Sequence, residues 1–210
     1  SIQQLLLALE IAEKQTIFDT VFIADAYSEL GLNYNELGDN STAKNYLIYS
    51  IDLFEKAGKT EDVANVKSDL AVVYHDQGKY PEAISLFNEV YQMDLLSGDK
   101  RKQSSSLNNI GRMYIDWKKY ETGLEYYFRS IQLLDTIADK EVLGIRYNNI
   151  GMVYQLMAKH RDAITWLEKA RKIDEKERNS IKLGIRYFNI GNSYLALRDF
   201  QNARINLEKS

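Results

Sequence analysis

The sequence predicts an all-α fold, a solenoid of antiparallel helix pairs, and three observations support this prediction. They are a 40-residue internal period, helical spacing of apolar residues inside each period, and helix-breaking residues between its two halves. The period is clearest in five tyrosines that lie 40 residues apart: Tyr34, Tyr74, Tyr114, Tyr154 and Tyr194. Five copies in register, without insertion or deletion, indicate an array of equal structural units.

Four further columns share this register, two of small residues and two of bulky apolar ones. Small residues stand three positions before and nine after each tyrosine: Gly31, Ala71, Gly111, Gly151 and Gly191, then Ala43, Ala83, Gly123, Ala163 and Ala203. Bulky residues stand four before and thirteen after it: Leu30, Leu70, Ile110, Ile150 and Ile190, then Leu47, Phe87, Tyr127, Leu167 and Leu207. These offsets follow the helical period twice, so each copy should form two helices that meet at small residues.

Turn residues separate the expected helices. Glycines mark both kinds of turn, Gly38 and Gly78 within a copy and Gly58 and Gly98 between copies. Pro81 stands where a second helix begins, a position at which its missing N–H costs no hydrogen bond. Asp99 and Asp139 precede first helices, where a carboxylate can cap free backbone N–H groups, so we expect both to be N-caps.

We therefore expect an opening helix at about 2–14 and five helix pairs after it. First helices should lie near 20–37, 60–77, 100–117, 140–157 and 180–197. The expected organisation is a single array over 1–210: the helix of a truncated repeat at 1–14, then repeats at about 20–57, 60–97, 100–137, 140–177 and 180–210, the last one truncated. Because the sequence opens with Ser1 and stops within an expected helix, we expect it to be a segment of a longer protein.

Composition argues against several classes of function. The chain has 45% hydrophobic and 27% charged residues and a net charge of −3, with no block of Lys or Arg. A nucleic-acid partner needs a basic face that displaces phosphate counterions, so none is expected for this segment. The absence of cysteine excludes disulfides, thiolate metal sites and a cysteine nucleophile. Apolar runs such as residues 5–9 are too short to span a bilayer, so no membrane role is expected for this segment.

The columns resemble those of the tetratricopeptide repeat. Residues 108–114, Asn-Asn-Ile-Gly-Arg-Met-Tyr, followed by Tyr120 and Gly123, resemble its signature, and so do residues 148–154. The 40-residue form is similar to that of kinesin light chains, Leu-Gly-Asn-type spindle adaptors and bacterial peptide-sensing regulators. The resemblance implies a right-handed superhelix, a protein or peptide partner, and a place as the sensor or scaffold segment of a larger bacterial signalling or transcription-regulatory protein. Two departures are Ala71, in place of glycine, and the shortened last repeat.

In this family the first helix of each pair lines a concave groove, which implies a set of partner-binding residues. The candidates are Asp69, Asp76, Asn108, Asn109, Arg112, Asn148, Asn149, Met152, Phe188, Asn189 and Asn192. The groove should be acidic in the N-terminal copies, where Asp25, Glu29 and Glu36 join this face. It should be rich in amides, with apolar pockets, in the C-terminal copies.

Three of these candidates form a ladder, since Asn109, Asn149 and Asn189 recur 40 residues apart. A primary amide both donates and accepts hydrogen bonds, so the ladder could grip an extended peptide backbone without regard to its sequence. The alternative is that each amide bonds within the array, to a neighbouring helix or to water.

Other residues have weaker claims to a function. A clamp for the C-terminal carboxylate of a chaperone needs several basic residues on this face, whereas only Arg112 lies at an inward position. Arg146 and Arg186 lie one residue away from inward positions, at the edge of the groove, and should form salt bridges between repeats. His160 occupies an aromatic column and should pack, and His75 satisfies no ligand-spacing rule. No cofactor, metal site or catalytic group is therefore expected.

Two functions from different classes follow from this reading. The favoured one is a module that binds a protein or peptide partner in its groove. The alternative is a structural array that self-associates into a homo-oligomer and holds no ligand in the groove. Catalysis would require an attached domain.

Overall fold

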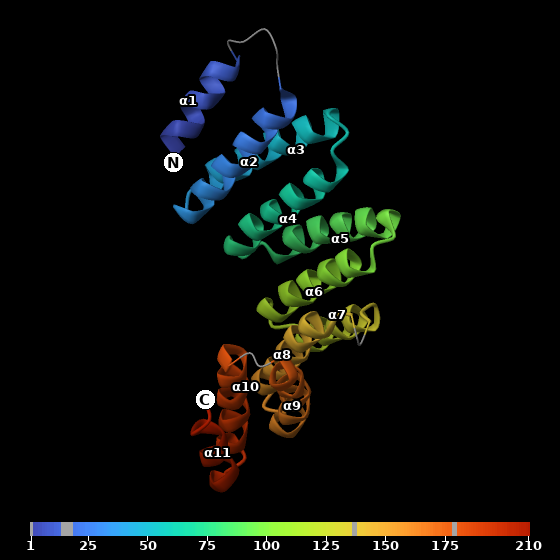
Figure 1. The fold of residues 1–210 in the computed structure, drawn as a ribbon. Coiled ribbons are helices and arrows are strands. Elements are labelled where there is room, and N and C mark those ends of the chain that lie inside the picture. The colour runs from blue at the N-terminus through green and yellow to red at the C-terminus, as the bar shows by residue number, and fades with distance from the viewer. Residues whose placement is uncertain (1, 14–18, 136–137, 178–179) are drawn as a thin grey trace. The chain divides into compact units, whose positions relative to one another are not determined.

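The computed structural model describes residues 2–13, 19–135, 138–177 and 180–210, and all regular elements in these ranges are α-helices (Figure 1). They are α1 (Ile2–Glu13), α2 (Thr20–Glu36), α3 (Asn40–Lys56), α4 (Thr60–Asp76), α5 (Tyr80–Ser97), α6 (Lys100–Asp116), α7 (Tyr120–Gln132), α8 (Lys140–Leu156), α9 (His160–Glu177), α10 (Ser180–Ala196) and α11 (Phe200–Leu207). The predicted all-α class, with helices packed in tandem pairs, is confirmed. Residues 14 and 136–137, which belong to predicted repeats, lie outside the described residues.

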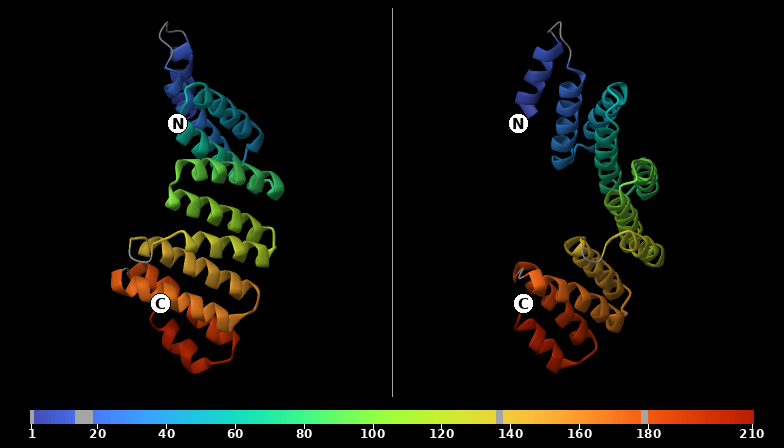
Figure 2. Two further views of the ribbon diagram at one scale, coloured as in Figure 1. Left: turned by 90° about the vertical axis from the view of Figure 1, so that its right-hand side faces the viewer. Right: turned by 45° about the vertical axis from the view of Figure 1, so that its right-hand side comes forward.

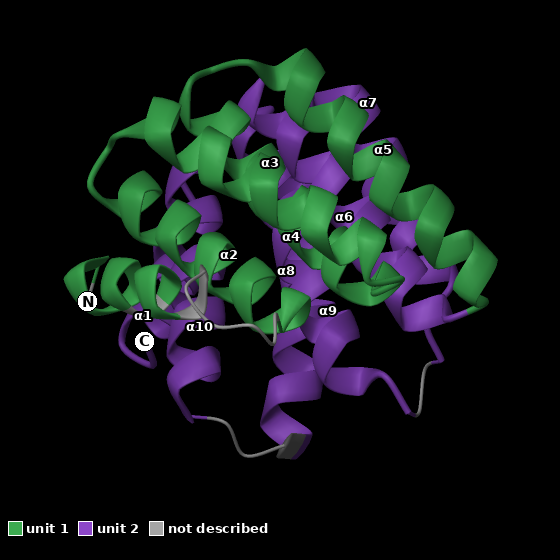
Figure 3. Cartoon of the chain, turned by 90° about the horizontal axis from the view of Figure 1, so that it is seen from above, with its two compact units in different colours: residues 1–98 green, residues 99–210 purple. Residues whose placement is uncertain are grey.

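The chain divides into two compact units (Figure 3). Unit 1 spans Ser1–Gly98 and contains α1–α5, and unit 2 spans Asp99–Ser210 and contains α6–α11. The single array over 1–210 stays a prediction. Within each unit the two helices of a copy run antiparallel (Figures 1 and 2), and the first helices begin at residues 20, 60, 100, 140 and 180, as the period predicts.

Small residues allow the helices of a pair to approach closely, as the columns predict. A Cβ atom added to Gly111 of α6 would lie 2.7 Å from Cδ1 of Tyr127 and 3.0 Å from the carbonyl oxygen of Gly123 on α7. The same addition at Gly31 would meet Leu47 at 2.6 Å. These distances are shorter than van der Waals contact, so the bulky column fills the space that the small column leaves.

Neighbouring pairs complete each other's cores. In unit 1 one apolar cluster joins α2, α3 and α4, and its members include Leu47, Phe54 and Val66. In unit 2 the equivalent cluster joins α6, α7 and α8 around Tyr127 and Ile150. A single helix pair would leave these faces in water, and stacking the next first helix on it buries them.

The turn inside each copy has the same backbone geometry. One residue with positive φ follows each first helix by two positions: Gly38, Gly78, Lys118, Ala158 and Arg198. The N–H group of the next residue donates to the carbonyl oxygen of the column tyrosine, over 2.8 to 3.0 Å in all five copies. This is the Schellman arrangement, which satisfies carbonyl groups that the helix end leaves free. The sequence has glycine at two of these positions and gives no sign of the turn geometry at the other three.

The third copy departs from the other copies in two ways. Its second helix, α7, has 13 residues, whereas α5 and α9 have 18, because aspartate side chains bind the backbone beyond Gln132. The N–H group of Asp135 donates to Oδ2 of Asp139 at 2.8 Å, and that of Ala138 donates to Oδ1 of Asp135 at 2.7 Å. Such local bonds compete with continued helix.

Asp139 is therefore not an N-cap through its side chain, although it stands at the N-cap position of α8. Its carboxylate also accepts a hydrogen bond from Nε of Arg101 on α6. Asp99 does cap α6, because its Oδ1 atom accepts from the N–H groups of Arg101 and Lys102 at 2.9 and 3.1 Å. Pro81 lies in the first turn of α5, as predicted.

Candidate functional site

In unit 1 the predicted acidic positions lie on α2 and α4. Asp25, Glu29 and Glu36 are exposed, whereas Asp69 is half-buried. Burial raises the pKa of Asp69 to about 6. Among the described residues no cation pairs with this carboxylate, so no opposite charge offsets the effect of burial on its pKa. The acidic character predicted for these first helices is therefore carried mainly by exposed carboxylates.

The carboxylate of Asp76, at the end of α4, is held by two neighbours. Nδ2 of Asn35 on α2 donates to Oδ2 of Asp76 at 3.1 Å, and Nδ1 of His75 lies 3.0 Å from Oδ1. Asp76 is nevertheless exposed. The bond from Asn35 links the first helices of two adjacent copies, and the carboxylate remains open to solvent.

In unit 2 the first helices α8 and α10 expose an unusual number of apolar side chains. Met152 is 45% exposed, Leu156 60% and Phe188 52%. We call this surface the α8–α10 face and define it by Ile145, Met152 and Leu156 of α8 and by Ile181, Ile185, Phe188 and Leu195 of α10. The spacing of these residues, three, four or seven positions, places them on one side of each helix.

Hydrogen bonds between the two helices hold this face together. Nε2 of Gln155 on α8 donates to the carbonyl oxygen of Asn189 and to Oγ of Ser193, both at 2.7 Å. Nδ2 of Asn189 donates to Oδ1 of Asn148 at 3.3 Å, and Nδ2 of Asn148 contacts Sδ of Met152 at 3.2 Å. At Asn189 and Asn148, the amides thus bond within the array.

The other two members of the ladder differ from Asn189. Asn109 on α6 and Asn149 on α8 are half-buried, and neither side chain makes a hydrogen bond to another described residue. Asn192 on α10 is also half-buried, and Arg112 on α6 is exposed. The proposed use of Asn109 and Asn149 by a ligand stays a prediction.

The two arginines predicted to bridge repeats behave differently. Nε of Arg186 donates to Oδ2 of Asp174 on α9 at 2.9 Å, and both side chains are buried, so this salt bridge is confirmed. Arg146 on α8 makes no ion pair with any described residue, and its Nε atom is buried without a hydrogen-bond partner, so the prediction for Arg146 is wrong. The sequence explains the difference. Asp174 lies 12 residues before Arg186, whereas the residue 12 positions before Arg146 is the uncharged Leu134.

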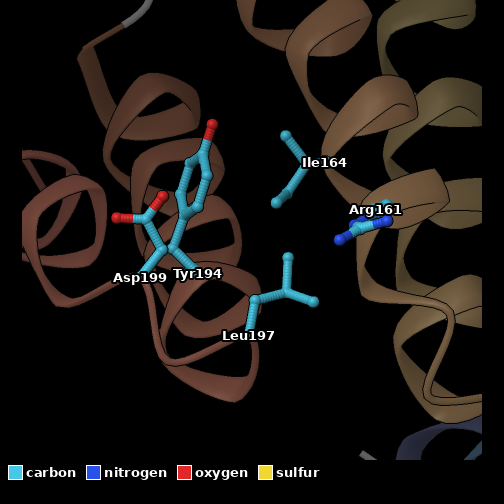
Figure 4. A pocket seen from close by; sticks show the side chains of 5 residues that line it. All are labelled: Arg161, Ile164, Tyr194, Leu197 and Asp199. Atoms are coloured by element: carbon cyan, nitrogen blue, oxygen red, sulfur yellow. The ribbon is translucent and has the colours of Figure 1, made fainter.

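A cavity of about 410 Å³ lies beside α9 (Figure 4). Arg161 and Ile164 of α9 line one side of it, and Tyr194, Leu197 and Asp199 line the other. This cavity contains none of the candidates from the sequence.

The described part of the chain can be compared with the requirements of a metal site and of a membrane-spanning helix. Within it, no group of three or more His, Cys, Asp or Glu residues could hold a metal ion. Among the described helices, none combines the length and apolar character needed to cross a bilayer.

Sequence reasoning missed two features of the α8–α10 face. Gln155 has no signal in the sequence, because its column holds residues as different as Asn35, His75 and Leu195. The isoleucines could have been found, since Ile181, Ile185 and Phe188 follow helical spacing on a helix whose opposite side holds the repeat columns.

Comparisons with known proteins agree with the repeat period. The sequence model of the tetratricopeptide repeat matches residues 22–96, 62–136, 102–176 and 141–210. The fold is similar to that of BtubC (BKLC) from P. vanneervenii, at 19% identity, covering 99% of this chain and 87% of that one, with a TM-score of 0.82.

Two further solved structures are similar. One is a Signal Transduction ATPase with Numerous Domains protein with a tetratricopeptide repeat sensor from Pyrococcus horikoshii. The match has 20% identity and a TM-score of 0.82, and it covers 99% of this chain and 32% of that one. The other is the apo form of the quorum sensor NprR from B. thuringiensis, at 16% identity, 99% and 57% coverage and a TM-score of 0.76. A search of curated proteins gave no match. At these identities the similarity establishes the fold alone.

Proposed function

The chain belongs to the tetratricopeptide repeat family, and we propose that it binds a protein or peptide partner on its first helices, with the α8–α10 face as the main contact. The segment would act as the sensor or scaffold part of a larger bacterial signalling or regulatory protein. Two structural neighbours are sensors by name, which supports this role.

The exposed apolar side chains of the α8–α10 face are the observation that carries the proposal. Single exposed apolar residues are normal on a soluble protein. Here Met152, Leu156 and Phe188 are joined by four more on two helices that hydrogen bonds hold side by side. Exposed apolar side chains grouped on neighbouring helices, together with polar groups, are typical of an interaction site. Asn149 and Asn192 supply such polar groups, with amides that can meet a peptide backbone.

The test is a selection of peptides from a random display library with the 210-residue chain as bait. We expect binders whose affinity falls about tenfold when Leu156→Asp places a charge on the face. The matched control is Leu96→Asp, because Leu96 is also an exposed leucine, on α5 of unit 1. Binders that respond equally to both variants, or a library that yields no binders, would refute the proposal.

The same apolar surface supports a second candidate, self-association of two copies through the α8–α10 face. Sedimentation of the purified chain distinguishes the two functions. A dimer that Leu156→Asp converts to monomer, together with no selected peptide, would favour the structural role. A monomeric wild type that binds peptides supports the groove.

A further inference from the structure

The cavity beside α9 has the size of a small-ligand site, and its walls combine an aromatic ring with a cation. Its volume of about 410 Å³ lies within the range of about 300–1,000 Å³ that such sites occupy. The ring of Tyr194 lies on one side and the guanidinium of Arg161 on the other, with the aliphatic side chains of Ile164 and Leu197 between them in the view of Figure 4. Leu197 is 38% exposed, so its side chain does not fill the space.

The third copy shows which group can lie against a column tyrosine at this place. Trp117, at the C-cap of α6, has the position that Leu197 has in the fifth copy. Its indole is stacked on Tyr114, with ring centroids 6.4 Å apart and an angle of 19° between the planes. Nζ of Lys119 lies over the same indole, 3.3 Å from its centroid. This protein therefore already holds one aromatic ring in contact with both a column tyrosine and a cation.

The fifth copy has the tyrosine and a cation but lacks the ring that would contact both. Asp199 stands where the third copy has its lysine, and its carboxylate is engaged by α11. The backbone N–H group and Nδ2 of Asn202 donate to that carboxylate at 3.2 and 2.7 Å. Arg161 supplies the cation, because it is exposed and its side chain makes no ion pair or hydrogen bond with another described residue. Its guanidinium is available to lie over an aromatic face.

The preceding copy fills the equivalent space with its own side chains. Leu124 and Met157 stand one period before Ile164 and Leu197. Leu124 is buried in the cluster of α6, α7 and α8, and Met157 packs against the same cluster. The cluster that joins α9 to α10 includes neither Ile164 nor Leu197 among its described members. The cavity is therefore not a necessary gap of the repeat, since well-packed apolar side chains can close it.

We propose that this cavity binds a small aromatic molecule, a flat ring system of about the size of an indole, between Tyr194 and Arg161. The ring would stack on Tyr194, as the indole of the third copy stacks on its tyrosine. The guanidinium would lie over the other face of the ring, where the negative charge of the π system attracts a cation. Ile164 and Leu197 would cover the edges of the ring. The cavity shares no residue with the α8–α10 face, so this inference does not depend on the proposed function.

Two probes of similar size test the aromatic requirement on the full 210-residue chain. Naphthol is a flat aromatic bicycle, and decahydronaphthol has the same skeleton without π electrons. Titrations followed by the backbone amide signals in NMR spectra give both the affinity and the location of each probe. We expect naphthol to bind about tenfold more tightly than decahydronaphthol, with the largest changes at Ile164, Leu197 and their neighbours.

Variants connect this affinity to the cavity, and their amide spectra also show that they are folded. Leu197→Trp gives the fifth copy the residue of the third, so the new indole should occupy the cavity and lower the affinity for naphthol about tenfold. Arg161→Met removes the cation and should weaken naphthol several-fold while leaving decahydronaphthol unchanged. The control is Arg204→Met, at an exposed arginine of α11 outside the cavity lining, which should change neither affinity.

Several results would overturn the aromatic site. They are equal affinity for the two probes, naphthol binding that Leu197→Trp leaves intact, and signal changes centred away from the cavity. Absence of naphthol binding up to its solubility limit would also overturn it. If Arg161→Met weakens both probes alike, the guanidinium shapes the cavity and does not contact the ring, and the proposed site is wrong in that form. Each of these outcomes leaves the proposed function standing, because the peptide selection tests it separately.

Discussion

Nε of Arg186 donates to Oδ2 of Asp174 at 2.9 Å, and the two side chains are only 6% and 2% exposed. This ion pair joins α10 to α9, the second helix of the preceding copy. One period earlier, Arg146 has Leu134 in the register of the aspartate. The chain thus contains a paired and an unpaired arginine at equivalent positions. Comparing substitutions at the two positions measures how much the ion pair contributes to the free energy of unfolding.

We predict that Arg186→Met destabilises the protein by about 3–5 kcal/mol, because it leaves the buried carboxylate of Asp174 without a counter-charge. Removing both charges, with Asp174→Leu and Arg186→Met, should restore most of that loss. Arg146→Met should leave stability unchanged or raise it. Urea unfolding followed by circular dichroism measures all three. Comparable losses in the Arg146 and Arg186 variants would contradict the prediction.

Backbone strain predicts a second effect, at the turn within each copy. Ala158 has φ +57°, a left-handed conformation that costs a residue with a Cβ about 1 kcal/mol. Ala158→Gly should therefore raise stability by about that amount, and Gly78→Ala, at φ +72°, should lower it similarly. The control is Ala57→Gly, because Ala57 has φ −81° and glycine gains nothing there. A rise in the melting temperature for the control as well would show that the strain is not the cause.

The buried carboxylate of Asp69 predicts a dependence on pH. Its folded pKa, about 6, lies above its ordinary value of 3.8, so the folded state holds the proton more tightly. The stabilisation from this group is complete below pH 4 and disappears as the pH rises through 6. Asp69→Asn should match wild type at pH 4 and exceed it at pH 8, by about 1 kcal/mol after screening by solvent. An equal difference at both pH values, measured by thermal unfolding, would rule out the ionisation.

The asparagine ladder gives a prediction that separates structure from binding. Asn189→Ala removes the hydrogen bond to Asn148 and should cost about 1 kcal/mol of stability. Asn149→Ala removes no bond to a described residue, so the melting temperature should barely change, whereas affinity for a selected peptide should fall several-fold. If Asn149→Ala instead lowers the melting temperature and leaves affinity intact, the amide serves the array and is not a ligand group.

The period determined which parts of the fold were predictable. Tyr114 and Gly111 have equivalents in every copy or nearly so, and five repetitions of one pattern leave little doubt about helices and their pairing. Departures arise where a single copy substitutes a polar group. Asp135 and Asp139 end α7 early through bonds that depend on the two side chains together, and no column shows such a pair.

The candidate site was less predictable, because its properties depend on contacts between copies. Asn149 and Asn189 occupy one column, yet only Asn189 is bonded to a neighbouring helix. Arg146 and Arg186 occupy another, and the residue that distinguishes them lies 12 positions earlier on a different element. Identical residues at equivalent positions of the copies therefore predict where each side chain lies on its helix. They predict its hydrogen-bond partner only when the residues that face it are also the same in every copy.

The uniform turn within each copy has a consequence for how such a chain can change length. The bond from the residue after Gly38, Gly78, Lys118, Ala158 or Arg198 to its column tyrosine uses only backbone atoms. An unequal crossover that joins the turn of one copy to the turn of another would therefore preserve every closing bond. Recombination that adds or removes a whole 40-residue copy would therefore join two turns whose closing hydrogen bond is independent of side chains.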